Sequence, residues 1–106
     1  LGFAPALDQR VVSRVLTHMH EHGSSWRQPY AVNVSAASIA DPNWMRELAD
    51  MIRSSEVAGE RLVFEISERA AMENIDATAA FISQVRNLGA RAALDDFGTG
   101  FSSFYY

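Results

Sequence analysis

Leu62-Val63-Phe64-Glu65-Ile66-Ser67 is the segment from which the architecture of this chain follows most directly. Its alternate positions Leu62, Phe64 and Ile66 are large and apolar. Side chains alternate between the two faces of a strand, so this spacing predicts a strand with one face packed against a hydrophobic layer. Glu65 is then expected on the opposite face.

Two further segments of the same kind flank this one, Tyr30 to Ser35 before it and Arg91 to Asp95 after it. Helical spacing of apolar residues predicts helices over 7–21, from Asp41-Pro42 to about Ser55, and from Ile75 to Gly89. Each connection between strands is therefore long enough for a right-handed parallel crossover. The pattern predicts an α/β fold in which three parallel strands alternate with three helices.

The composition is that of an ordinary folded domain, with 106 residues of which 48% are hydrophobic and 21% are charged. The absence of cysteine excludes disulfides and thiolate metal sites and fits a reducing compartment. A net charge of -4 without a basic cluster argues against binding to long nucleic acids. We expect one incomplete domain over residues 1–106, because the sequence begins at Leu1 without a methionine and no linker divides it.

Asn33, Glu65 and Asp95 each lie near the carboxyl end of one predicted strand, 32 and then 30 residues apart. The face that carries them otherwise holds smaller side chains, namely Ala31, Ser35, Val63, Ser67 and Ala93. Because α/β proteins gather their chemistry at the carboxyl ends of parallel strands, we expect the three polar side chains to converge. Two carboxylates and an amide oxygen suit Mg²⁺ or Mn²⁺, with Ca²⁺ as a competitor, and do not favour zinc.

Asp96 adds a second carboxylate directly beside Asp95 and opens the glycine-rich turn Phe97-Gly98-Thr99-Gly100. An aspartate pair at such a turn can hold one metal and reach toward a second, as two-metal phosphodiester hydrolysis requires. A lone Asn or Glu in a strand is more often a structural hydrogen-bonding residue. The combination of equivalent positions, an aspartate pair and a glycine-rich turn is what favours a metal site.

Three segments resemble, in order and spacing, successive signatures of the EAL domain family. They are Tyr30-Ala31-Val32-Asn33-Val34-Ser35, Val63-Phe64-Glu65-Ile66-Ser67-Glu68 and Ala93-Leu94-Asp95-Asp96-Phe97-Gly98-Thr99-Gly100-Phe101-Ser102-Ser103. The third is highly specific, and the resemblance covers essentially the whole chain. It implies the first half of a modified TIM barrel, here a partial TIM-type (β/α) barrel. Ser67 departs from the pattern, since threonine is commoner at that position.

The resemblance implies a cyclic-di-GMP phosphodiesterase that yields linear pGpG with Mg²⁺ or Mn²⁺. It implies that Asn33, Glu65 and Asp95 coordinate metal, with Asp96 at the second metal or at the attacking water. Glu68 matches the family glutamate that steadies the loop after the third strand. Thr99 lies in that loop.

The same resemblance places the EAL motif glutamate before Leu1, and a lysine, further acidic ligands and the general-base glutamate after Tyr106. Three parallel strands also leave two open edges and an uncovered inner face, whereas parallel sheets are usually buried on both sides. The 106 residues alone are therefore expected to be inactive and to need self-association, such as a homodimer, or the rest of the domain. A non-catalytic cyclic-di-GMP receptor is the alternative function. We expect a cytoplasmic domain, flanked by sensory or GGDEF-type modules and anchored, if at all, by segments outside this chain.

Other patterns have plainer interpretations. His18 and His22 have the spacing of a metal pair, but cations at a helix end also interact favourably with its dipole. Asp96-Phe97-Gly98 resembles a kinase metal motif, although no H-R-D loop accompanies it. Trp44, Met45 and Met51 are expected to pack in the core or between helices. The aromatic residues of the tail are expected either to pack in the barrel or, as the resemblance implies, to position the site and a dimer contact: Phe101, Phe104, Tyr105 and Tyr106.

Overall fold

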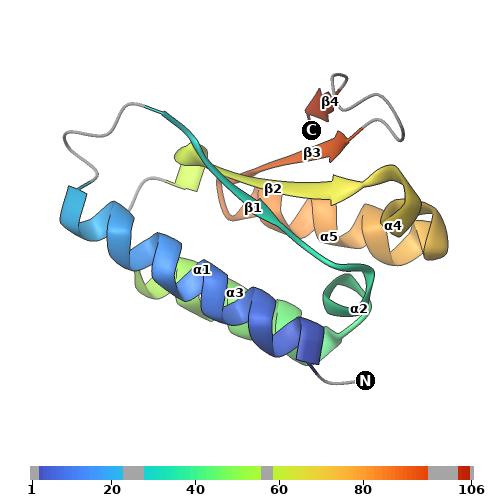
Figure 1. Ribbon diagram of the computed structural model, residues 1–106, viewed down its shortest axis with the longest axis horizontal. Coiled ribbons are helices and arrows are strands. Elements are labelled where there is room, and N and C mark those ends of the chain that lie inside the picture. The colour runs from blue at the N-terminus through green and yellow to red at the C-terminus, as the bar shows by residue number, and fades with distance from the viewer. Residues whose placement is uncertain (1–2, 23–27, 56–58, 96–102, 106) are drawn as a thin grey trace.

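The computed structural model describes residues 3–22, 28–55, 59–95 and 103–105. The sheet contains three parallel strands and a fourth, antiparallel strand at one edge, all in the spatial order of the sequence. The structure confirms the predicted α/β alternation of the parallel strands with three longer helices (Figure 1). The parallel strands are β1 Tyr30–Asn33, β2 Leu62–Ser67 and β3 Arg91–Asp95, and the helices are α1 Phe3–His22, α3 Pro42–Ser54 and α5 Ile75–Asn87.

The hydrophobic core lies between one face of the sheet and these helices. In β2 the apolar positions Leu62, Phe64 and Ile66 are each 0% exposed, as their alternation predicted. The Phe64 ring meets the Phe81 ring of α5 edge to face, with centroids 5.9 Å apart. Such aromatic pairs add packing energy beyond burial of area. In Figure 1, α1 and α3 run side by side along the same side of the sheet.

Residues of α3 complete this layer. Trp44 is buried at 3% exposure, with its ring 6.1 Å from that of Phe81, and Met45 and Met51 pack against the core. The packing predicted for these three residues is confirmed. Helix α3 begins as expected, because the Asp41 carboxylate accepts hydrogen bonds from the backbone N–H groups of Asn43 and Trp44.

The structure adds short elements that the sequence pattern did not predict. Helices α2 Ala36–Ile39 and α4 Glu68–Glu73 directly follow β1 and β2, and the 3-10 turn η1 Gly59–Arg61 precedes β2. A serine caps each of the two short helices, since the hydroxyl of Ser35 accepts from the N–H of Ser38 and that of Ser67 from the N–H of Ala70. Both helices are too short to show an apolar period, which is why helical spacing missed them.

The carboxy-terminal tail contains a strand that the sequence pattern did not predict. Ser103–Tyr105 forms β4, which pairs antiparallel with β3. The predicted open edge at β3 is therefore paired where the structure describes it. Aromatic residues favour strands, and hydrogen bonding to an unpaired strand edge outweighs the turn-like composition of the tail. The glycine-rich part of the tail, 96–102, lies outside the described residues.

No helix in the described ranges is both long enough and apolar enough to cross a membrane.

Gly89 ends α5 with φ at +87°, the left-handed conformation that favours glycine after a helix. A Cβ added there would meet nothing within 4 Å, so only the backbone opposes a side chain. We expect Gly89→Ala to lower the free energy of unfolding by about 1 kcal/mol. Urea denaturation followed by circular dichroism measures this loss. An unchanged unfolding midpoint would show that the turn relaxes without cost.

Candidate functional site

Asn33, the last residue of β1, stands directly opposite Glu65, two residues before the end of the neighbouring parallel strand β2. Asn33 of β1 is the register partner of Glu65 of β2. Both lie on the face away from the helices, since their sequence neighbours Val32, Phe64 and Ile66 are buried in the core. Asn33 is exposed and Glu65 is partly buried. Side chains at such positions extend from strands about 4.8 Å apart, so these two oxygen donors are neighbours on one face of the sheet.

Asp95 does not share that row. Its register partner is Ser67, whereas Glu65 pairs with Ala93, so Asp95 lies two residues farther along the sheet. The expectation of three strictly equivalent positions is therefore wrong for Asp95. The packing of the apolar face sets this two-residue offset, because it makes Phe64 the register partner of Ala92 and so places Glu65 opposite Ala93. Asp95 remains on the same face as Glu65, with Cα atoms roughly 8 Å apart on the diagonal, given standard strand spacing and rise.

Part of the predicted site falls on residues whose placement is not described. The side chain of Asp95, and all of Asp96 and Thr99, lie outside the described residues. Glu68 is described as the first residue of α4, directly after β2, and it is partly buried. It lines a small neighbouring hollow with Arg69 and Met72, beside the strand ends.

A pocket of about 440 Å³ opens at the carboxyl ends of β1 and β2. Asn33 and Glu65 line it together, along with residues that follow the two strands. Three other charged residues also line the pocket, and sequence reasoning did not single them out: Asp8, Arg69 and Glu73. Arg69 and Glu73 come from the missed helix α4, and Asp8 comes from α1. The pocket thus contains both carboxylates and a guanidinium, the groups expected where a cation and an anionic ligand meet.

The donor chemistry of the pocket fits a hard divalent cation. The amide of Asn33 and the carboxylate of Glu65 offer oxygen atoms only, which suits Mg²⁺ or Mn²⁺. Within the described part of the chain, no group of three His, Cys, Asp or Glu side chains is placed to hold a metal.

The histidine pair lies elsewhere. The ring centroids of His18 and His22 are 4.7 Å apart, and Nδ1 of His18 is 2.9 Å from the hydroxyl oxygen of Tyr30. Tyr30 is the first residue of β1, so these histidines sit at the end of the sheet opposite to Asn33. Their geometry links them to a structural tyrosine and not to the strand-end pocket.

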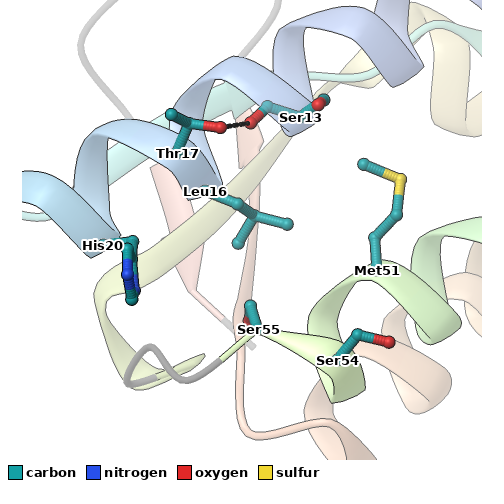
Figure 2. A pocket seen from close by; sticks show the side chains of 7 residues that line it. All are labelled: Ser13, Leu16, Thr17, His20, Met51, Ser54 and Ser55. Carbon is teal, nitrogen blue, oxygen red and sulfur yellow. Dashed lines mark hydrogen bonds between the residues drawn. The ribbon is translucent and has the colours of Figure 1, made fainter.

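A larger hollow, of about 630 Å³, lies between the carboxy-terminal halves of α1 and α3 (Figure 2). Figure 2 shows Leu16 and Met51 extending into it from the two helices. Its other lining groups are hydroxyls and one imidazole, from Ser13, Thr17, His20, Ser54 and Ser55. The Thr17 hydroxyl donates to the Ser13 carbonyl at 3.0 Å. With no carboxylate in its lining, this hollow offers no ligand set for a hard cation.

Comparison with known proteins identifies relatives along the whole chain. The family model of the EAL domain matches residues 1–106. The cyclic di-GMP phosphodiesterase PdeF of Escherichia coli K12 is 26% identical over 97% of this chain. The cyclic di-GMP phosphodiesterase NbdA of Pseudomonas aeruginosa is 33% identical over 99% of this chain. The chain spans 14% of the length of each of these relatives.

A solved structure shows the same architecture. The FimX EAL domain of Pseudomonas aeruginosa, determined bound to c-di-GMP, superposes with a TM-score of 0.81 at 26% identity. The superposition covers 94% of this chain and 40% of the FimX chain. EAL domains are TIM-barrel folds, so the sheet described above corresponds to part of such a barrel.

Proposed function

Because the chain belongs to the EAL domain family, we propose that it forms part of a metal-dependent phosphodiesterase domain that hydrolyses cyclic di-GMP to linear pGpG. The observation that carries this proposal is the pairing of Asn33 with Glu65 at the carboxyl ends of β1 and β2, beside a pocket of about 440 Å³. The naming of curated relatives as cyclic di-GMP phosphodiesterases supports the reaction.

In this proposal, Asn33, Glu65, Asp95 and Asp96 would hold one or two Mg²⁺ or Mn²⁺ ions. The bound cation would acidify water and neutralise charge developing on the phosphate. Asn33 and Glu65 supply an amide oxygen and a carboxylate from adjacent strands, so the rigid sheet fixes their separation. Asp96 would orient the attacking water or bind a second cation.

Two further residues order the site from its edge. Glu68 begins α4 directly after the Ser67 cap, which fixes the position of its backbone relative to β2. We assign Glu68 the role of steadying the loop that follows β3, and Thr99 a place within that loop. Arg69 lines the same pocket as Glu65 and gives it a cationic group suited to a phosphodiester.

The remainder of the barrel belongs to segments outside these 106 residues. This chain covers 40% of the FimX EAL chain, and one edge of its sheet, β1, is unpaired among the described strands. The isolated 106 residues are accordingly proposed to be inactive. The complete domain is proposed to be cytoplasmic and to self-associate, for example as a homodimer. The 106 residues span only 14% of the length of each of these curated relatives, which leaves room for flanking sensory or GGDEF-type domains.

A receptor that binds the nucleotide without cleaving it is the second candidate. The c-di-GMP complex of the FimX EAL domain, a structural neighbour, supports nucleotide binding by this fold. The two candidates share the pocket and differ in whether the metal set is complete.

Product analysis separates the two. We expect the full-length protein with Mn²⁺ to convert cyclic di-GMP to pGpG, detected by liquid chromatography. The reaction is expected to stop when EDTA removes the metal and to resume when Mn²⁺ is restored. Binding of cyclic di-GMP without pGpG formation would favour the receptor instead.

A further inference from the structure

One carboxylate oxygen of Asp8 gathers three hydrogen bonds from the segment that follows β1. Oδ2 accepts from the backbone N–H of Ser35 at 2.9 Å and from the Ser35 hydroxyl, also at 2.9 Å. It accepts a third from the hydroxyl of Ser38 at 2.6 Å. Asp8 lies in α1 and Ser38 in α2, so these bonds join elements that are far apart in the sequence.

These hydrogen bonds are sheltered from water. Ser38 is 0% exposed, and Asp8 and Ser35 are both partly buried. Hydrogen bonds to a charged acceptor are roughly twice as strong as neutral ones, and low local dielectric strengthens them further. The Ser35 hydroxyl also accepts from the N–H of Ser38 and so caps α2. Asp8 therefore fixes the backbone and the cap of Ser35 together.

The fixed segment begins two residues after Asn33. On the strand side, the N–H of Val34 donates to the carbonyl of Glu65 at 2.9 Å, which continues the pairing of β1 with β2 beyond Asn33. On the loop side, Asp8 holds Ser35. Asn33 is thus clamped between two anchors. Asp8 itself lines the strand-end pocket with Asn33 and Glu65.

We propose that Asp8 is a positioning residue that sets the orientation of Asn33 toward a divalent cation shared with Glu65. This inference rests on the proposed function, because it needs Asn33 to be a metal ligand. Removing a group that orients a metal ligand without touching the metal typically lowers metal affinity or activity 10- to 100-fold. Loss of Asp8 would free Ser35 and the turn into α2, and Asn33 would sample orientations that do not face Glu65.

The competing explanation is that Asp8 only joins α1 to α2 and contributes stability. Asp41 provides a matched control, since its carboxylate likewise accepts hydrogen bonds at a helix start, in this case from the backbone N–H groups of Asn43 and Trp44. Asp41 caps α3 and does not line the strand-end pocket. Both replacements remove a carboxylate that holds a helix start, but only Asp8 connects to Asn33.

The test uses the full-length protein and Mn²⁺ alone, titrated by isothermal calorimetry, with melting temperatures measured on the same samples. Asp8→Ala is expected to raise the Mn²⁺ dissociation constant about tenfold. Ser38→Ala, which removes one of the three donors and leaves a buried methyl group, is expected to have a smaller effect in the same direction. Asp41→Ala is expected to lower the melting temperature while leaving Mn²⁺ affinity within about twofold.

Asn33→Ala separates failure of this inference from failure of the proposed function. If Asn33→Ala weakens Mn²⁺ binding but neither Asp8→Ala nor Ser38→Ala does, the positioning role is wrong and the metal site stands. The positioning role is also wrong if Asp41→Ala loses as much affinity as Asp8→Ala. If Asn33→Ala leaves Mn²⁺ binding unchanged, the proposed metal role of Asn33 falls, and the role of Asp8 falls with it.

Discussion

Glu65→Gln is expected to lower the turnover of cyclic di-GMP by the full-length protein by about 10²-fold or more. The substitution keeps the size of the side chain and one oxygen but removes its negative charge. Glu65 is the register partner of Asn33 and lines the strand-end pocket, so its carboxylate is placed to share a cation with that amide. Without the carboxylate, the cation would lose the negative charge that balances it and would keep only a neutral amide oxygen, which is a weaker ligand.

The measurement is the initial rate of pGpG formation at several Mn²⁺ concentrations. Excess Mn²⁺ should restore part of the rate if the defect is in metal affinity. Glu60→Gln serves as the control, because Glu60 precedes the opposite end of β2 and is exposed. It removes the same charge and is expected to change the rate less than twofold. Equal losses in the two variants would point to overall charge, and an unchanged rate in Glu65→Gln would end its assignment as a ligand.

Asp95→Ala extends the same test to β3. We expect turnover to be abolished, because Asp95 lies on the same face as Glu65, one diagonal step along the sheet. Turnover close to that of the parent protein would show that Asp95 is not a ligand. It would also raise the question of whether Asn33 and Glu65 alone could hold the cation.

The longer elements were predictable because burial of one face gives each of them a regular spacing of apolar residues. The apolar alternation of Leu62 to Ser67 and the cap at Asp41 fixed β2 and the start of α3 to the residue. Helices α2 and α4 were not predictable from periodicity, since each is shorter than two turns. Their signal was local: a serine at the end of each strand that caps the turn after it, Ser35 and Ser67.

The site was predictable only where the strand positions alone define it. Asn33 and Glu65 could be paired from their place in two similar strands, but the offset of Asp95 depends on register, which the apolar faces set in three dimensions. Asp8 could not be connected to Asn33, because packing of α1 against α2 brings them together. One signal was present: Asp8 is an acid four residues before buried Val12, on the stripe of α1 that continues to Leu16.

Phe64→Ala is expected to lower the free energy of unfolding by about 3–5 kcal/mol, a large part of the 5–15 kcal/mol typical of a domain. Phe64 is 0% exposed and supplies most of the bulk in its row of the sheet. Its partners across the strands are Val32 and Ala92, which are too small to fill the space that the ring leaves. The edge-to-face contact with Phe81 would be lost as well.

Urea denaturation of the purified domain, followed by circular dichroism, measures this loss. Ile75→Ala is the control, because Ile75 is 68% exposed and its truncation should change stability by no more than about 0.5 kcal/mol. Strands on both sides of β2 hold its backbone in place, so the cavity cannot close by moving the strand. A loss below about 1 kcal/mol for Phe64→Ala would mean that Phe81 and its neighbours repack into the space. The sheet would then be supported mainly by its strand pairing and less by the aromatic layer beneath it.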